Sequence, residues 1–115
     1  MSVALTEQAV VERRKTVTRR LGWVFAKPGD RLTLCRKVMG RKKGESLVRL
    51  AEVELVAVDR QRLVDIEPAD VAREGFPDWT PAQFVEFFCE SMNVAPATQV
   101  TRLEWRYLDQ EPSHG

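Results

Sequence analysis

The chain has 115 residues, of which 43% are hydrophobic and 30% are charged, and its formal net charge is +1. This size suits one domain with one core, and the composition is globular rather than disordered. No apolar run approaches the ~20 residues that a membrane-spanning helix needs, and the N-terminal residues lack a secretory signal. We therefore expect one cytoplasmic domain over residues 1–115, with a core over about 8–108, a loose tail at 110–115 and no membrane partner.

The cysteines and the histidine argue against a metal site. Cys35 and Cys89 stand alone among apolar residues, without CxxC spacing, which favours buried free thiols. His114 is the single histidine and lies in the polar tail, which excludes histidine-based metal cages and histidine-dependent triads. The chain also contains no Walker or GxGxxG phosphate loop. We expect neither a metal nor a cofactor.

The near-neutral total hides an uneven distribution of charge. Residues 1–50 hold 13 Lys and Arg against 4 Asp and Glu, whereas residues 51–115 hold 5 against 13. A basic N-terminal half indicates a local anionic partner. The alternative, which we weight equally, is that the two halves neutralise each other across the fold.

Residues 5–14 have the pattern of a short helix that Thr6 would cap. The segment KTVTRR follows at 15–20, and its β-branched residues favour an extended backbone. Taken alone, such a segment is most often a solvated basic strand. It also offers guanidinium, ammonium and hydroxyl groups that suit phosphate or carboxylate.

Residues 21–25 place Trp23 and Phe25 beside a glycine. We expect one or both rings in the core, although a Trp23 exposed beside the basic strand could stack on a base. The KPGD sequence at 27–30 predicts a turn, and the alternation over 31–38 predicts a strand with leucines facing inward.

Residues 39–46 form a glycine-bounded hairpin loop in this prediction, with Arg41, Lys42 and Lys43 at its centre. Three consecutive cations most often mark a solvated loop. In a protein that binds nucleic acid they would hold phosphate without reading sequence.

A long strand is predicted over residues 47–59. Its apolar residues change parity along the run, so we expect a bulge or sharp bend near Ala51, of the kind that helps a small sheet to curl. A further short strand is predicted at 63–66.

The remaining elements carry clear end signals. Residues 68–74 read as a brief helix that a glycine terminates, and TPAQ at 80–83 is a capping box that begins a phenylalanine-rich helix. The last strand covers 100–108. Together these elements predict an α+β fold around a small curled sheet.

The order of motifs resembles the ASCH domain of the PUA-like superfamily, over about residues 8–108. The resemblance lies in RKTVTRR at 14–20, which contains K-T-x-T-x-R, then KPGDRL at 27–32 and EGF at 74–76. One departure is Glu12-Arg13, where ASCH domains usually carry a glycine. The resemblance implies a small β-barrel of about five to six strands, flanked by two or three short helices.

The resemblance also implies a basic cleft between the K-T-x-T-x-R segment and Glu74 that binds RNA or a nucleotide-like ligand. The ligand-binding residues in this reading are Lys15, Thr16, Thr18, Arg19, Arg20, Trp23, Arg41, Lys42 and Lys43. A branch of short members resembles an amidohydrolase acting on N(4)-acetylcytidine, and Lys15, Thr18 and Glu74 match its active group. The partner would then be a modified nucleoside rather than RNA. A third reading is an accessory module that binds another protein.

Overall fold

The computed structural model describes residues 1, 3–36 and 48–108. In chain order, the elements are the 3-10 helix η1 (Ala4–Thr6), α1 (Glu7–Val11), β1 (Val17–Arg20), β2 (Arg31–Cys35), β3 (Arg49–Arg62), the 3-10 helix η2 (Leu63–Asp65), α2 (Pro68–Arg73), α3 (Pro81–Met92) and β4 (Gln99–Tyr107). The α+β class predicted from the sequence is confirmed.

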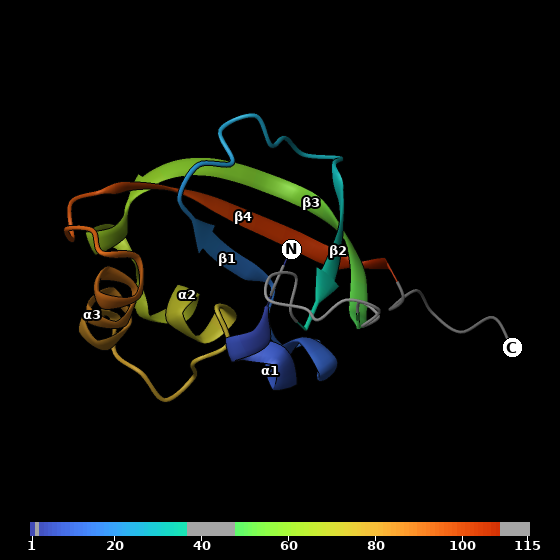
Figure 1. Ribbon diagram of the computed structural model, residues 1–115, viewed down its shortest axis with the longest axis horizontal. Helices are drawn as coiled ribbons and strands as arrows, with labels where there is room; N and C mark the ends of the chain where they lie inside the picture. Colours follow the sequence, from blue (N-terminus) through green and yellow to red (C-terminus); the bar gives the residue numbers. More distant parts are fainter. Residues whose placement is uncertain (2, 37–47, 109–115) are drawn as a thin grey trace, which may run out of the picture.

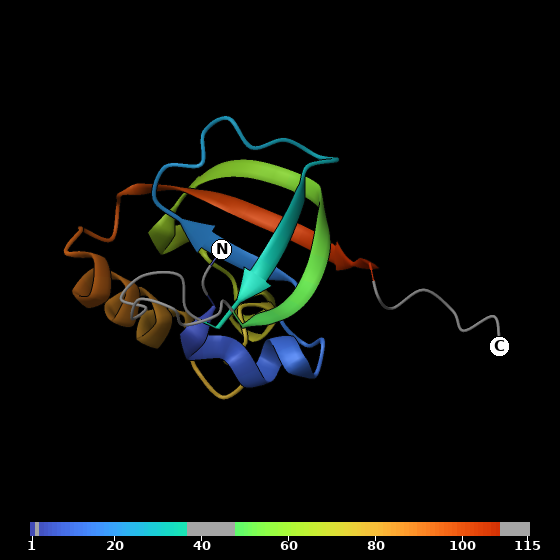
Figure 2. The ribbon, with the colours of Figure 1, turned by 45° about the vertical axis from the view of Figure 1, so that its right-hand side comes forward.

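The four described strands form one antiparallel sheet in the order β1-β4-β3-β2. The sheet is strongly curved, and the three α-helices gather on one side of it (Figures 1 and 2). β1 and β2 are the edges of this order, so the described strands pair as an open sheet. The predicted count of five to six strands and the closure of a barrel are not confirmed.

The predicted irregularity near Ala51 is present. Leu34 pairs with Ala51 and the next residue, Cys35, pairs with Arg49, which leaves Leu50 as the extra residue of a bulge. A second shift follows where β3 pairs with β4, at Val56. Bulges of this kind bend a strand and increase its twist, which accounts for the curl of β3.

The core has two parts. One cluster lies under the sheet and contains Leu34, Val53, Leu55, Leu103 and Trp105 among its buried side chains. The other packs the start of β4 against η2, α2 and α3, with the buried residues Leu63, Ile66, Val71, Val85, Val100, Phe84 and Phe88. The capping box predicted for the phenylalanine-rich helix α3 is formed, because Thr80 and Gln83 exchange hydrogen bonds of 2.8 and 3.2 Å.

Three local predictions were wrong. Residues 63–66 are not a strand but the 3-10 helix η2 with its C-cap, because a 3-10 turn places Leu63 and Ile66, three residues apart, on one buried side. The first helix ends at Val11 rather than at residue 14, and Thr6 makes no capping hydrogen bond. Trp23 and Phe25 are both exposed, Phe25 by 94%.

Cys35 is a buried free thiol, and Cys89 is a half-buried one. Within residues 1, 3–36 and 48–108, no helix combines the length and hydrophobicity that crossing a bilayer requires. The same residues contain no group of three or more His, Cys, Asp or Glu side chains placed to hold a metal ion.

Gly75 follows α2 and packs against η1 and α1, and its replacement is expected to destabilise the protein. Its φ is +109°, and a Cβ would lie 3.1 Å from Thr6 Cγ2 and 3.2 Å from Ala9 Cβ. Gly75→Ala should lower the free energy of unfolding by about 2–3 kcal/mol, from backbone strain and overpacking together. Gly29→Ala is the matched control, because Gly29 also has a positive φ but open space around it. Equal losses in urea denaturation would contradict the packing argument.

Candidate functional site

Lys15 enters the interior just before β1 begins. The chain reverses after α1 through Arg13, whose φ is +60°, and the Lys15 N–H then donates to the Ala9 carbonyl at 3.1 Å. The Lys15 carbonyl accepts hydrogen bonds from Trp105 Nε1, at 3.1 Å, and from the Tyr107 hydroxyl. These bonds fix the backbone of Lys15, and its side chain is 3% exposed.

Lys15 and Glu74 form a buried ion pair. Lys15 Nζ donates to the Glu74 carbonyl at 2.7 Å and to Glu74 Oε1 at 3.1 Å. Burial lowers the pKa of the Lys15 ammonium, and the nearby Glu74 carboxylate works in the opposite direction without cancelling that effect. A lysine with a lowered pKa can accept a proton closer to neutral pH than an exposed one.

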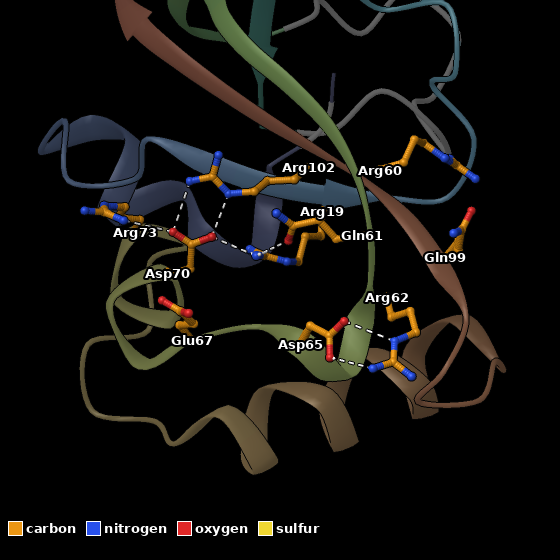
Figure 3. A pocket seen from close by; sticks show the side chains of 10 residues that line it. All are labelled: Arg19, Arg60, Gln61, Arg62, Asp65, Glu67, Asp70, Arg73, Gln99 and Arg102. Carbon is orange, nitrogen blue, oxygen red and sulfur yellow. Dashed lines mark hydrogen bonds and ion pairs between the residues drawn. The ribbon is translucent and has the colours of Figure 1, made fainter.

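Arg19 links Glu74 to a second carboxylate. Its guanidinium lies 3.3 Å from Glu74 Oε2, 2.7 Å from Asp70 Oδ2 and 3.1 Å from Gln61 Oε1. Arg102 and Arg73 also bind Asp70, so that one carboxylate receives three guanidinium groups (Figure 3). This Asp70 cluster, which consists of Asp70, Arg19, Arg73 and Arg102, holds the helix α2, and therefore Glu74, against the sheet.

The carboxyl group of Asp70 is strongly acidic in this setting. Burial alone would raise the pKa of Asp70, but the hydrogen bonds from Arg102, Arg19 and Arg73 outweigh burial and hold that pKa well below its usual range. Asp70 is therefore ionised wherever the protein is folded at ordinary pH. The buried cations of the basic N-terminal half are thus neutralised by carboxylates from the acidic half.

The ion pair lies in the wall of a pocket of about 230 Å³. The polar part of the wall consists of Thr6, Lys15, Thr18, Arg19, Arg20 and Glu74. The apolar part comes mainly from the loop after α2 and from α3, and includes Phe76, Phe84, Phe87, Phe88 and Met92. The pocket therefore combines a cationic and hydroxyl-bearing end with an aromatic lining.

The Thr18 hydroxyl already accepts one hydrogen bond. Arg20 Nε donates to Thr18 Oγ1 at 3.3 Å, and Thr18 is 3% exposed. A hydroxyl that accepts from a guanidinium keeps its own proton free to donate, and the positive charge stabilises negative charge that develops on the oxygen. Lys15 and Thr18 line the same pocket because Lys15 lies at the junction before β1 rather than on the strand.

Two other predicted ligand residues, Thr16 and Trp23, do not line this pocket. Thr16 is half-buried, and its backbone links α2 to β4. Its N–H donates to the Arg73 carbonyl at 2.9 Å, and its carbonyl accepts from the Trp105 N–H. Trp23 lines a separate hollow with Val24 and Phe25, away from the Lys15 pocket. The predicted phosphate contacts Arg41, Lys42 and Lys43 lie outside the described residues.

Sequence reasoning missed Asp70 and Arg102 as partners of the site. A signal for Asp70 was available, because residues 70 and 74 are four apart in a short helix and share one face. No local signal pointed to Arg102, which reaches Asp70 from β4. Phe84 and Phe88 of α3 are buried in the core and also line the pocket.

Solved structures with the same fold identify the architecture. The ASCH domain from Lactobacillus crispatus JV V101 matches with a TM-score of 0.63 and 13% identity, covering 90% of this chain and 70% of that one. The chain has the fold of an ASCH domain. Protein EF3133 from Enterococcus faecalis V583, described by the family model DUF984, matches this chain with a TM-score of 0.66 and 19% identity, covering 96% of this chain and 74% of that one.

No protein-family model matches the sequence, and no curated protein matches it. At identities of 19% and 13%, the two solved structures establish the ASCH fold alone. The resemblance read from the K-T-x-T-x-R motif is confirmed at this level, and what the pocket does rests on its own geometry.

Proposed function

We propose that the protein is a small amidohydrolase that removes an acyl group from a modified nucleoside such as N(4)-acetylcytidine. The observation that carries this proposal is the pocket itself, in which Lys15, Thr18 and Glu74 line one hollow of about 230 Å³. A nucleophilic hydroxyl, a lysine of lowered pKa and a carboxylate lining one site are the groups that acyl transfer requires.

The shape and lining of the pocket suit a nucleoside. Ligand pockets are mostly apolar, with a few convergent polar groups that set orientation. Phe76 and Phe87 offer aromatic surface to a base, while the acyl carbonyl would point to the cationic end at Lys15 and Arg20.

In the proposed reaction, the Thr18 hydroxyl attacks the acetyl carbonyl carbon as its proton passes to neutral Lys15. The Arg20 guanidinium stabilises the negative charge on the carbonyl oxygen, the amide C–N bond breaks, and the departing amino group takes the proton back from Lys15. Water then hydrolyses the acetyl ester of Thr18 by the same route. The products are cytidine, acetate and one proton released to solvent, so atoms and charge balance.

A second candidate is binding of a nucleotide-like ligand without chemistry. The ion pair between Lys15 and Glu74 favours it, because two of the three N–H donors of Lys15 are already satisfied by Glu74. A lysine held in this way can stay protonated and serve only to orient a ligand. The two candidates share the pocket and differ in whether product forms.

The deciding experiment incubates the purified protein with N(4)-acetylcytidine and follows cytidine and acetate by chromatography. We expect kcat/KM to rise with pH as Lys15 loses its proton, because Lys15 acts when neutral. Since the pKa of Lys15 is lowered, kcat/KM should level off below pH ~10.4, which is the pKa of a free lysine side chain. Calorimetry on the same sample measures binding. Binding without product favours the second candidate, and absence of both removes the nucleoside proposal.

A further inference from the structure

The loop that joins β1 to β2 carries a concentration of exposed apolar side chains. Among the described residues, ten large hydrophobic side chains are exposed, and four of them fall within positions 21–25. This segment, which we call the apolar tip, lies on the side of the sheet away from the helices (Figures 1 and 2). Its exposed side chains are those of Leu21, Trp23, Val24 and Phe25, and Phe25 is 94% exposed. Contiguous exposed apolar side chains, unlike single ones, mark a site of interaction.

The sheet holds the apolar tip in this exposed conformation. The Thr101 hydroxyl on β4 donates to the Gly22 carbonyl, and it accepts from Arg60 on β3 at 2.8 Å. The Ala26 N–H donates to the Trp23 carbonyl at 3.1 Å. Trp23 has a φ of +56°, which a bulky residue rarely adopts, so its ring is kept at the surface against backbone strain. A loop fixed in this way loses little conformational entropy when it binds a partner.

An apolar hollow of about 450 Å³ lies within the same surface. Residues of the apolar tip form part of its lining, and β2 and β3 supply the rest. Apart from Asp30, the lining is apolar and consists of Trp23, Val24, Phe25, Ala26, Leu32 and Leu55. Because the exposed Phe25 ring stands at the hollow, one surface carries both an apolar projection and an apolar recess. Such a surface can be complementary to a second copy of itself.

The charges beside the hollow are self-complementary too. Lys27 and Asp30 belong to one turn, yet neither side chain forms an ion pair within residues 1, 3–36 and 48–108. The Asp30 carboxylate instead accepts the backbone N–H of Lys27 at 3.1 Å. An unpaired cation and an unpaired carboxylate suit a partner that presents the same two charges in the reverse order. A two-fold axis produces this arrangement, because each residue that contacts another across the axis is contacted by it in return.

We propose that the apolar tip is the interface of a two-fold symmetric dimer, in which Phe25 of each copy packs into the hollow of the other. Lys27 of each copy then pairs with Asp30 of the other. Two-fold dimers are the commonest soluble oligomers, and an aromatic side chain buried in a pocket is a typical interface anchor. The hollow shares no lining residue with the Lys15 pocket, so the dimer does not depend on the hydrolysis proposed there.

Sedimentation velocity over a series of protein concentrations measures the association. The wild type should change from the 13.2 kDa chain to twice that mass as the concentration rises. Phe25→Ser should weaken dimerisation at least about tenfold, because truncation of a central aromatic anchor commonly has an effect of this size. Val11→Ser is the matched control. It removes an apolar side chain that is 50% exposed on α1, outside the hollow, and dimerisation should be unchanged.

A charge exchange tests the pairing across the two-fold axis. Lys27→Glu places two carboxylates opposite each other at both contacts, and Asp30→Lys places two ammonium groups there. Each variant alone should therefore dimerise more weakly than the wild type. An equimolar mixture of the two should dimerise more strongly than either alone, because both contacts then join opposite charges. Misfolding of either variant cannot produce a gain on mixing.

The proposal fails if the wild type stays monomeric up to about 1 mM, or if Phe25→Ser dimerises as the wild type does. It fails equally if mixing the two charge variants produces no gain. Growth beyond two copies would indicate an open, head-to-tail contact and would reject the two-fold dimer. Binding of a monomeric wild type to phosphatidylcholine vesicles, lost in Phe25→Ser, would assign the apolar tip to a lipid surface instead.

Discussion

The Lys15→Met variant is expected to release cytidine from N(4)-acetylcytidine at least about a hundredfold more slowly than the wild type. Methionine keeps most of the length and volume of the side chain but removes the group proposed to move the proton. General acid–base catalysis by a positioned side chain contributes about 10²–10⁴-fold. The measurement is kcat/KM at a temperature where circular dichroism shows the variant to be folded.

Lys27→Met provides the matched control, because Lys27 lies in the exposed turn before β2 and outside the pocket. Its rate should equal that of the wild type. Thr18→Val tests the nucleophile in the same assay, since it removes the hydroxyl and little volume, and it should abolish turnover. Release of cytidine by Lys15→Met at the wild-type rate would rule out the proposed mechanism.

Local sequence signals predicted most of the secondary structure because they act over a few residues. The capping box at Thr80, the glycine after α2 and the parity change near Ala51 all have short-range causes, and each appears in the structure. The position of Trp23 has no such signal. Gly22 and Trp23 both adopt positive φ, of +76° and +56°, which turns the segment away from the core. A bulky residue rarely adopts this conformation, so propensity does not predict it.

The candidate site was predictable in part, for a similar reason. Lys15, Thr18 and Glu74 were identified from the resemblance to ASCH domains, and the structure brings all three to one pocket. Arg19 was expected to contact the ligand, and it does line the pocket, but it is 4% exposed and bonded to two carboxylates. These bonds form only because β1 pairs with β4 and α2 packs beside them. They join residues that lie more than 50 positions apart in the sequence. Short-range patterns carry no information about such contacts.

Asp70→Asn is expected to be the most destabilising single substitution in the Asp70 cluster. The carboxylate holds Arg19, Arg73 and Arg102 through hydrogen bonds of 2.6–3.1 Å, and it is 8% exposed. Removing one partner of a buried ion pair costs about 3–5 kcal/mol, because the remaining charge stays buried and uncompensated. Domains of this size are stable by about 5–15 kcal/mol, so the loss is a large fraction of the total.

Asp65→Asn makes the same chemical change in an exposed ion pair with Arg62, where both side chains are more than half exposed. Its effect on the free energy of unfolding should stay within about 0–1 kcal/mol. Urea denaturation of both variants at neutral pH gives the comparison. Equal losses in the two variants would show that the Asp70 cluster contributes no more than a surface ion pair.

The pH dependence of stability provides an independent check on Asp70. Its pKa is lowered in the folded protein, so the unfolded chain binds the proton more tightly. The stabilisation by Asp70 is therefore fully present above the ordinary carboxyl pKa of about 3.9, and it is lost as the pH falls toward the lowered folded value. The difference in unfolding free energy between wild type and Asp70→Asn should shrink steadily from about pH 5 downward. A difference that stayed constant to pH 2 would mean that the variant is destabilised by altered packing rather than by the missing charge.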